Sequence, residues 1–549
     1  MWYDVQKLGS IGLTEPTSPA NSEARILECE QKPQMGASST AVAVGTPDLR
    51  VADIEAVAQA GAVVRMDAAV RSRIERSYAF VQRLAAAGAP VYGLTTGCGP
   101  LAAQPVPPAR RAEFQRNLIR SHATTLGVPH PAAFVRAAMV VRAHGLAQGH
   151  SGVDPATVEI LIAMLNNRVH PVVREVGSVG ASGDLVELAQ IALAVVGEGE
   201  VEHANGMVLA TEALRGSGIE PLVPRYREGL ALMNGTSFHT GVAALLCVKA
   251  ARGLNAAQIA AAMSLEGLRA NSEAFDPAFA RLRPHPGQRV VADAVRRLVE
   301  GSALMRNGTS SASNQDAYTL RCIPQIIGPI LDVLRSVTAT VDIEINSVTD
   351  NPLFLPDEDR VVHGGNFHGQ PVAMALDQLK AAIVELGVLS ERRLARLLDV
   401  KLNAGLPPFL IIDDAGLRSG FMGLQYCASS MAADNAVLAA PASVHSVPTN
   451  ANNQDVVSMG MVAARQARQV IDNVERMIAI ELLCAAQAID LRGAVHAGTG
   501  TRAAHAAVRE RLAALIEDRP LAADIATVAM MIDDGTLQQR VETAVGSLA

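Results

Sequence analysis

Aromatic residues are scarce in this chain: they make up 3% of its 549 residues, and there is a single tryptophan. A core must therefore be built from small and aliphatic side chains, because hydrophobic residues still reach 49% of the sequence. Ala and Leu lose little conformational entropy when they enter a helix. Alternating runs of β-branched residues are scarce as well. The composition therefore predicts a mostly α protein.

Lysine is almost absent, with five residues among the 47 basic ones, and no run of basic residues occurs. The formal net charge is −7. Proteins that bind nucleic acid in general carry basic patches that neutralise phosphates. The sequence therefore predicts no nucleic-acid partner.

The cysteines are few and far apart, and none forms a C-x-x-C pair, so neither a disulfide framework nor a structural zinc site is indicated. They are Cys29, Cys98, Cys247, Cys322, Cys427 and Cys484. No run of 18 apolar residues and no secretory leader is present. We therefore expect free thiols, no metal, no membrane segment and a cytoplasmic location.

Four stretches differ in their patterning. Residues 1–46 mix Pro, Ser, Thr, Glu and Gly without periodicity, which is typical of a mobile extension. Residues 47–235 alternate short helical patterns with Gly-rich loops and predict an N-terminal domain. Residues 236–500 predict a central bundle of long helices, and residues 501–549 a C-terminal helical segment.

Three long segments in the central part, at about 316–347, 371–400 and 453–490, carry apolar residues at spacings of three and four. A helix of about 35 residues would be about 50 Å long. Such a helix needs other long helices to cover its apolar stripe, either from the same chain or from other subunits. This pattern predicts the bundle.

The Gly-rich loop at 177–183 contains the tripeptide Ala181-Ser182-Gly183. One interpretation is a helix start capped by Ser182 or Asp184. The other is chemical: in a tightly bent backbone, the Gly183 amide nitrogen can attack the Ala181 carbonyl carbon, because glycine has no Cβ. Loss of water and of the Ser182 hydroxyl would then leave a methylidene-imidazolone, a strong electrophile made from backbone.

A second Gly-rich loop runs from Tyr92 to Pro100 and has three glycines in nine residues. A phosphate-binding loop is the alternative interpretation. The loop lacks the lysine of a P-loop and the preceding strand of a dinucleotide site. We therefore expect no nucleotide cofactor.

Five further motifs follow in order, and with the two loops they carry a resemblance to a known family. They span 234–237, 315–322, 344–352, 363–369 and 450–455. From about residue 48 to near its end, the chain resembles the aromatic amino-acid ammonia-lyases and 2,3-aminomutases. This family uses a 4-methylidene-imidazol-5-one prosthetic group.

The resemblance implies a fold like that of fumarase and aspartase, mostly α, with an N-terminal domain that carries the prosthetic group and a central bundle of long helices. It also implies a homotetramer in which three subunits build each active site. The partner it implies is a small aromatic amino acid.

The resemblance assigns catalytic roles to motif residues. Ala181, Ser182 and Gly183 would cyclise to the prosthetic group, with no metal or nucleotide. Asn234 would bond the ring oxygen, Tyr92 would take the β-proton, and Arg321 would grip the substrate carboxylate, where its planar fork suits bidentate binding. Tyr318 is also assigned to the catalytic group. The other assigned residues line the substrate site: Gly99, Gln315, Phe367, Asn450 and Gln454.

These roles suit the chemistry of ammonia elimination, in which the β-proton is barely acidic and the amine leaves poorly. An electrophile that takes up the amine improves the leaving group. A buried tyrosine with a lowered pKa can then act as the base. Taken singly, Tyr92 could instead be a core phenol and Arg321 a structural ion-pair partner.

Two positions depart from the family pattern. Cys98 stands in a Gly-Cys-Gly sequence where the family usually has Gly-Phe-Gly, and Glu187 stands where the family often has proline. Neither position supplies an atom to the ring. We therefore expect both to affect pocket shape and not cyclisation.

Two positions bear on the substrate. Ser121-His122 resembles histidine lyases, and with Arg120 it also resembles tyrosine 2,3-aminomutases. Gln454 resembles phenylalanine and tyrosine enzymes, because histidine lyases carry Glu there. A lost carboxylate changes a charge, so Gln454 predicts deamination of tyrosine, and also phenylalanine, to the trans-cinnamate-type acid.

Two alternatives to this substrate assignment, and two roles for His122, stay open at the level of sequence. The chain could be a histidine ammonia-lyase, or a tyrosine 2,3-aminomutase that gives a β-amino acid. His122 would contact the substrate phenol in the tyrosine interpretation. It could instead be a structural histidine at the end of a helix.

Overall fold

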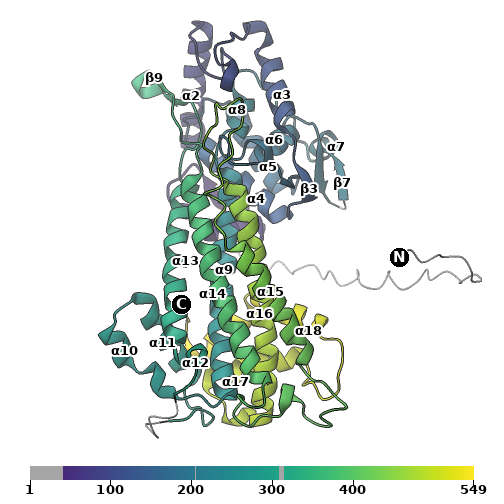
Figure 1. The fold of residues 1–549 in the computed structure, drawn as a ribbon. Coiled ribbons are helices and arrows are strands. Elements are labelled where there is room, and N and C mark those ends of the chain that lie inside the picture. The colour runs from purple at the N-terminus through teal and green to yellow at the C-terminus, as the bar shows by residue number, and fades with distance from the viewer. Residues whose placement is uncertain (1–40, 205, 308–314, 549) are drawn as a thin grey trace, which may run out of the picture. The chain divides into compact units, whose positions relative to one another are not determined.

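Four long helices packed side by side dominate the computed structural model, which describes residues 41–204, 206–307 and 315–548 (Figure 1). They are α9 (Ser237–Gly267), α13 (Ile323–Ile345), α14 (Gln370–Leu398) and α16 (Gly460–Arg492). Helix α16 packs along both α14 and α9, and α13 packs along α14. The mostly α class and the central bundle are therefore confirmed.

The bundle is flanked by shorter helices. Helix α15 (Met422–Leu438) packs against α14 and α16. The others that pack against the bundle are α11 (Pro286–Leu298), α17 (Thr499–Arg511), α18 (Ala522–Asp533) and α19 (Thr536–Val545). Helix α10 (Pro277–Leu282) packs against α11.

The N-terminal half carries short helices and small sheets. Its helices are α1 (Val51–Ala58), α2 (Ala68–Ala86), α3 (Arg111–His122), α4 (Ala132–Ala147), α5 (Pro155–Asn166), α6 (Leu185–Val195), α7 (Ala210–Gly216) and α8 (Glu228–Met233). Its strands are β1 (Val42–Val44), β2 (Val64–Met66), β3 (Leu126–Pro129), β4 (His170–Pro171), β5 (Arg174–Val176), β6 (Glu200–His203) and β7 (Gly206–Leu209).

The pairing within these sheets is local. Strands β1 and β2 are parallel, β3 pairs antiparallel with β5, and β4, β6 and β7 form an antiparallel sheet in that order. A hairpin of β8 (Leu353–Leu355) and β9 (Arg360–Val362) lies between α13 and α14 in the sequence.

The predicted extension at 1–46 lies outside the described residues up to Thr40, and its last residues belong to the fold. Val42–Val44 form β1 beside β2, and the side chains of Val42 and Val44 are buried. The end of the extension at residue 46 was therefore predicted too late, because a three-residue strand shows no periodicity. The boundaries near 235 and 500 stay predictions.

The predicted long segments differ from the observed helices at their ends. Segment 371–400 matches α14, but 316–347 is broken at Cys322 into α12 (Tyr318–Arg321) and α13. Pro324, in the first turn of α13, has no N–H to continue a helix from the preceding turn. Segment 453–490 becomes helical only at Gly460, because Met459 has a left-handed φ of 57°.

The periodicity of the sequence did not predict helix α9, because other helices surround α9 on all sides. Its residues are buried except Val248, Lys249, Ala251 and Arg252. A helix that is apolar all round has no stripe to detect. Among the described residues, α9 alone is long and apolar enough to cross a membrane, but 78% of its apolar window is buried inside the protein. Such burial is expected of the core helix of a bundle.

A buried ion pair joins three of the long helices. Arg393 of α14 donates to the Glu481 carboxylate of α16 at 2.5 and 2.8 Å, and both side chains are fully buried. The Ser264 hydroxyl of α9 donates to the same carboxylate at 2.7 Å. The pair therefore fixes how α9, α14 and α16 pack together.

Arg393→Met should destabilise the protein by about 3–5 kcal/mol, because it leaves a buried carboxylate without its cation. Arg83→Met is the matched control, since Arg83 pairs with Asp359 on the surface; it should cost less than about 1 kcal/mol. Urea unfolding followed by circular dichroism measures both. Equal losses in the two variants would contradict this role for the Arg393–Glu481 pair.

Candidate active site

Residues from six separate segments line one cavity of about 260 Å³, and one of these segments is that of Asn351, between α13 and β8. Tyr92 follows α2, Ser182 precedes α6, and Asn234 ends α8. Phe367 precedes α14 and Gln454 precedes α16. The cavity lies at the end of the bundle where α14 and α16 begin. The sequence motifs that carry the resemblance therefore meet at one place.

The backbone of the Ala181-Ser182-Gly183 loop is tightly bent. Gly180, Ser182 and Gly183 have φ values of 89°, 48° and 78°. Positive φ is uncommon for a residue with a Cβ, so Ser182 is strained. A Cβ built on Gly183 would lie 2.1 Å from the Gly235 carbonyl oxygen. Only glycine fits this position.

Hydrogen bonds hold both neighbours of the Gly183 nitrogen. The Ser182 carbonyl oxygen accepts from the Gly235 N–H at 3.1 Å, and the Asp184 N–H donates to the Gly235 carbonyl at 2.8 Å. The Gly183 N–H itself makes only a long contact of 3.3 Å to the Gly180 carbonyl, inside the loop. The loop is therefore a strained turn in which the Gly183 nitrogen is only weakly hydrogen-bonded. Such a geometry suits the ring closure expected of Ala181, Ser182 and Gly183.

Asn234 differs from its expected role. Its side-chain amide donates to Asp350 Oδ1 at 2.9 Å and to the Asn351 carbonyl at 3.1 Å. The Ser182 carbonyl oxygen, which would become the ring oxygen, accepts from the Gly235 N–H instead. In the uncyclised chain Asn234 therefore binds the Asp350 carboxylate, a strong acceptor, and its bond to the ring oxygen stays a prediction.

Asp350 is held by a buried arginine that the sequence analysis did not single out. Arg227 donates to both carboxylate oxygens, at 2.7 and 3.1 Å, and both side chains are almost fully buried. Burial alone would raise the pKa of Asp350, but the Arg227 guanidinium keeps this pKa below its usual value. An ionised Asp350 thus fixes the Asn234 amide. Asp350 lies in the 344–352 motif, and this position was the feature of the sequence that could have indicated its role.

The Tyr92 phenol lies against the loop that follows it. Its oxygen accepts from the Gly99 N–H at 2.8 Å. A Cβ built on Gly99, whose φ is 57°, would lie 2.5 Å from the Asn450 side-chain nitrogen. The structure therefore brings Tyr92, Gly99 and Asn450 together, as the resemblance implies.

The pKa of Tyr92 shifts in the direction opposite to the expected one. Burial raises this pKa, the neighbouring Cys98 raises it further, and only the Gly99 N–H opposes them. The prediction of a lowered pKa is therefore wrong for the single chain.

Gln454 contacts the loop that would cyclise. Its amide nitrogen donates to Ser182 Oγ at 3.4 Å, and its oxygen accepts from the Thr449 hydroxyl at 2.9 Å. Both ends of the amide are thus engaged. The cavity is also lined by residues to which the sequence analysis gave no role, although most lie in its motifs: Gly180, Asn351, Gly364, His368, Asn453, Asp455, Val456 and Val457.

Gln315, Tyr318 and Arg321 are not brought to this cavity. The Thr319 hydroxyl on α12 donates to the Leu389 carbonyl of α14. Leu389 is 19 residues beyond Gln370, where α14 begins; at 1.5 Å per residue this places α12 about 28 Å along the bundle. Tyr318 is 69% exposed, and Arg321 stacks on its ring at 4.8 Å. Within one chain, Arg321, which the resemblance assigns to the substrate carboxylate, therefore does not line the cavity.

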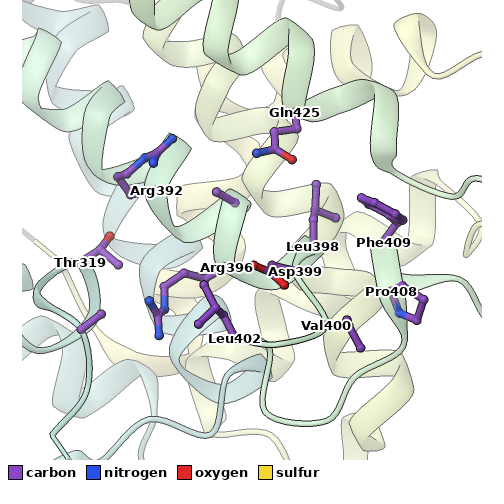
Figure 2. A pocket seen from close by; sticks show the side chains of 12 residues that line it. Thr319, Arg392, Arg396, Leu398, Asp399, Val400, Leu402, Pro408, Phe409 and Gln425 are labelled. Atoms are coloured by element: carbon purple, nitrogen blue, oxygen red, sulfur yellow. The ribbon is translucent and has the colours of Figure 1, made fainter.

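A larger cavity of about 670 Å³ lies beside α12, at the end of α14 (Figure 2). Thr319, Arg392 and Arg396 line one side of it, and Pro408 and Phe409 line the other. The sequence did not predict this cavity, because apart from Ala317 and Thr319 its lining residues lie outside the motifs. It contains none of the groups assigned to catalysis.

Ser121 and His122 end α3 and do not line the active-site cavity of the single chain. The Ser121 hydroxyl donates to the Leu118 carbonyl at 3.0 Å, and His122 Nδ1 lies 2.9 Å from the same oxygen. Helix α3 still runs close by, since Gln115 donates to the Gly93 carbonyl. These contacts resemble those of a structural histidine at a helix end.

Comparison with known proteins gives a consistent result. A family profile described as aromatic amino acid lyase matches residues 49–510. A histidine ammonia-lyase from Symbiobacterium thermophilum is 47% identical over 500 residues, which cover 91% of this chain and 98% of that protein. Another from Gloeobacter violaceus is also 47% identical over 500 residues, covering 91% of this chain and 97% of that protein.

Solved structures resemble the whole described fold. A tyrosine aminomutase from Streptomyces globisporus has a TM-score of 0.88 and 37% identity, covering 92% of this chain and 99% of that one. A histidine ammonia-lyase from Trypanosoma cruzi has a TM-score of 0.85 and 36% identity, covering 92% of this chain and 96% of that one.

Proposed function

Because the chain belongs to the aromatic amino acid lyase family and is therefore a carbon–nitrogen lyase, we propose that it removes ammonia from L-histidine without oxidation and releases urocanate. The observation that supports the lyase chemistry best is the strained Ala181-Ser182-Gly183 loop, which opens into the same cavity as Tyr92. The support for histidine comes from the curated relatives, which are histidine ammonia-lyases at 42–47% identity.

We propose that Ala181, Ser182 and Gly183 form the 4-methylidene-imidazol-5-one of this family, which when formed supplies the electrophile that takes up the substrate amine. The Gly235 N–H would keep its hold on the Ser182 carbonyl oxygen. Tyr92 would take the β-proton from the substrate once its own phenol has lost a proton. Phe367 and Gln454 would line the part of the cavity that holds the ring of the substrate.

We propose that Arg321 binds the substrate carboxylate in the active site of another copy of the chain. Tyr318 and Arg321 lie on a short exposed helix about 28 Å from the cavity of their own chain. Gln315 is also exposed. Exposed motif residues far from the cavity suit an active site completed by neighbours, as in the homotetramer that the resemblance implies. A guanidinium brought near Tyr92 would also lower the pKa of its phenol.

The activity should rise with pH. In the single chain, burial raises the pKa of Tyr92, so its phenol holds a proton at neutral pH and must lose it to act as a base. Between about pH 6 and 9, kcat/KM should therefore increase, by up to tenfold per unit while the phenol remains protonated. Tyr92→Phe should be nearly inactive throughout this range. A flat profile for the parent enzyme would contradict Tyr92 as the base.

The proposal of histidine as the substrate differs from the sequence-based prediction, in which Gln454 favoured tyrosine over histidine. A glutamine amide can both donate to and accept from an imidazole, so it does not exclude histidine. Tyrosine remains the second candidate, as a lyase or a 2,3-aminomutase substrate. Gln454, the Arg120-Ser121-His122 sequence and the similarity to the Streptomyces tyrosine aminomutase favour it.

Product analysis separates these candidates. The purified chain is incubated with L-histidine, L-tyrosine and L-phenylalanine in turn, and the products are resolved by chromatography with a parallel assay for ammonia. We expect urocanate and ammonia from histidine at the highest kcat/KM. Coumarate or β-tyrosine from tyrosine, without urocanate, would overturn histidine as the substrate and favour the second candidate. The cytoplasmic location stays a prediction.

A further inference from the structure

A carboxyl group is buried directly behind the loop that would cyclise. Glu187 lies in the first turn of α6 and is fully buried. Its Oε1 accepts from the Ser178 N–H at 2.9 Å, while its Oε2 has no hydrogen-bond partner among the described residues. Burial and the nearby Asp184 raise the pKa of Glu187 to about 8, so the group is mostly neutral at pH 7. A buried acid is costly to keep and calls for a function.

Ser178, the residue that Glu187 holds, ties the ends of the loop together. Its hydroxyl donates to the Gly183 carbonyl at 3.0 Å and accepts from the Gly180 N–H at 2.9 Å. Ser178 itself is buried. One hydroxyl thus connects the residue before Ala181 with the residue whose nitrogen must attack.

The peptide groups on both sides of the Gly183 Cα are therefore fixed by separate contacts. The Ser182 carbonyl is held by the Gly235 N–H, and the Gly183 carbonyl is held by the Ser178 hydroxyl. With both carbonyls held, the Gly183 N–H keeps only its 3.3 Å contact to the Gly180 carbonyl inside the loop. Fixing a reacting group in this way lowers the entropy that ring closure must lose.

We propose that Glu187 and Ser178 are positioning residues for the formation of the prosthetic group: the buried Glu187 carboxyl anchors Ser178, and the Ser178 hydroxyl orients Gly183 for attack on Ala181. This inference rests on the proposed prosthetic group. It also changes the interpretation of position 187, because the sequence analysis expected this departure from the family to affect pocket shape only.

The reaction that these residues would assist releases two molecules of water. The Gly183 nitrogen bonds to the Ala181 carbonyl carbon, and the Ala181 oxygen leaves as water with the hydrogens of the Gly183 and Ser182 nitrogens. The Ser182 hydroxyl leaves as a second water with the Ser182 α-hydrogen. No oxidant, reductant or further reactant is needed. Glu187 and Ser178 contribute no atom to the product.

The test follows the mass of newly made protein over time, because each finished ring lowers it by two waters. Glu187→Ala removes the anchor, Ser178→Ala removes the hydroxyl with little change in shape, and Glu187→Gln keeps an acceptor oxygen. Loss of one such hydrogen bond is expected to slow dehydration by about tenfold. We expect slow dehydration in the two alanine variants and a rate near the parent's in Glu187→Gln.

Glu266→Ala is the matched control. Glu266 is also fully buried and accepts from a backbone N–H, that of Gly498 at 2.7 Å, but it lies at the other end of α9. Thermal unfolding of every variant reports the loss of stability separately from the mass. Glu266→Ala should lower stability and still dehydrate at the parent's rate.

The outcomes are distinct. Ser178→Ala and Glu187→Ala that dehydrate as fast as the parent would overturn the positioning role, and so would equally slow dehydration in Glu266→Ala. If Glu187→Ala does not fold, Ser178→Ala decides the question alone. A parent chain that keeps its full mass would instead refute the proposed prosthetic group, and with it the proposed function.

Discussion

Ser182→Ala is expected to fold and assemble like the parent and to lose essentially all activity. Alanine has no hydroxyl to eliminate, so the methylidene group cannot form. The rate of elimination should fall on the order of 10⁴-fold or more, because the substrate amine then has no electrophile to bind and remains a poor leaving group. Steady-state assays with the preferred amino acid measure kcat and KM.

Measurements of folding and assembly show whether the loss of activity in Ser182→Ala is a loss of catalysis alone. Circular dichroism and sedimentation should match the parent, since among the described residues the Ser182 hydroxyl has one hydrogen bond, a long one of 3.4 Å from Gln454. The loss should appear in kcat rather than in folding. A Ser182→Ala protein that retains more than about a tenth of the parent kcat would contradict catalysis through this loop.

Mixed oligomers should recover activity from two inactive variants. Ser182→Ala lacks the electrophile, and Arg321→Ala lacks the carboxylate-binding group. If each active site takes Ser182 from one chain and Arg321 from another, random co-assembly leaves about a quarter of the sites with both groups intact. Co-expression of the two variants with different affinity tags, followed by tandem purification, allows the recovered activity to be measured.

The control for this experiment pairs two variants of the same loop. Gly183→Ala cannot adopt the loop, because its Cβ would lie 2.1 Å from the Gly235 carbonyl oxygen. Co-expression of Ser182→Ala with Gly183→Ala should restore nothing, since no chain then carries an intact loop. Failure of the Ser182→Ala and Arg321→Ala pair to recover activity would contradict an active site shared between chains.

Much of the helical architecture could be predicted from local pattern. Helix α14 has an apolar stripe on one face, so its extent was close to the predicted segment. Helix α9 has no such stripe because it is enclosed by its neighbours, and its length is visible only in three dimensions. The break at Cys322 depends on Pro324 and on the docking of α12 against α14.

The sequence predicted those residues of the candidate site that lie in motifs with a recognisable chemical role. Tyr92, Ser182, Phe367 and Gln454 meet in one cavity as the resemblance implies. The direction of the Tyr92 pKa and the partner of Asn234 were not predictable, because both depend on groups distant in sequence. Asp350, which holds the Asn234 amide, lies 116 residues further along the chain.

We propose that the backbone of three residues becomes the electrophile of this enzyme. The most direct test is the intact mass of the purified, folded parent chain, followed by fragmentation of the peptide that contains residues 181–183. We expect a mass lower than that of the sequence by two water molecules, with the whole deficit located in Ala181-Ser182-Gly183. A folded and active chain with the unmodified mass would contradict it.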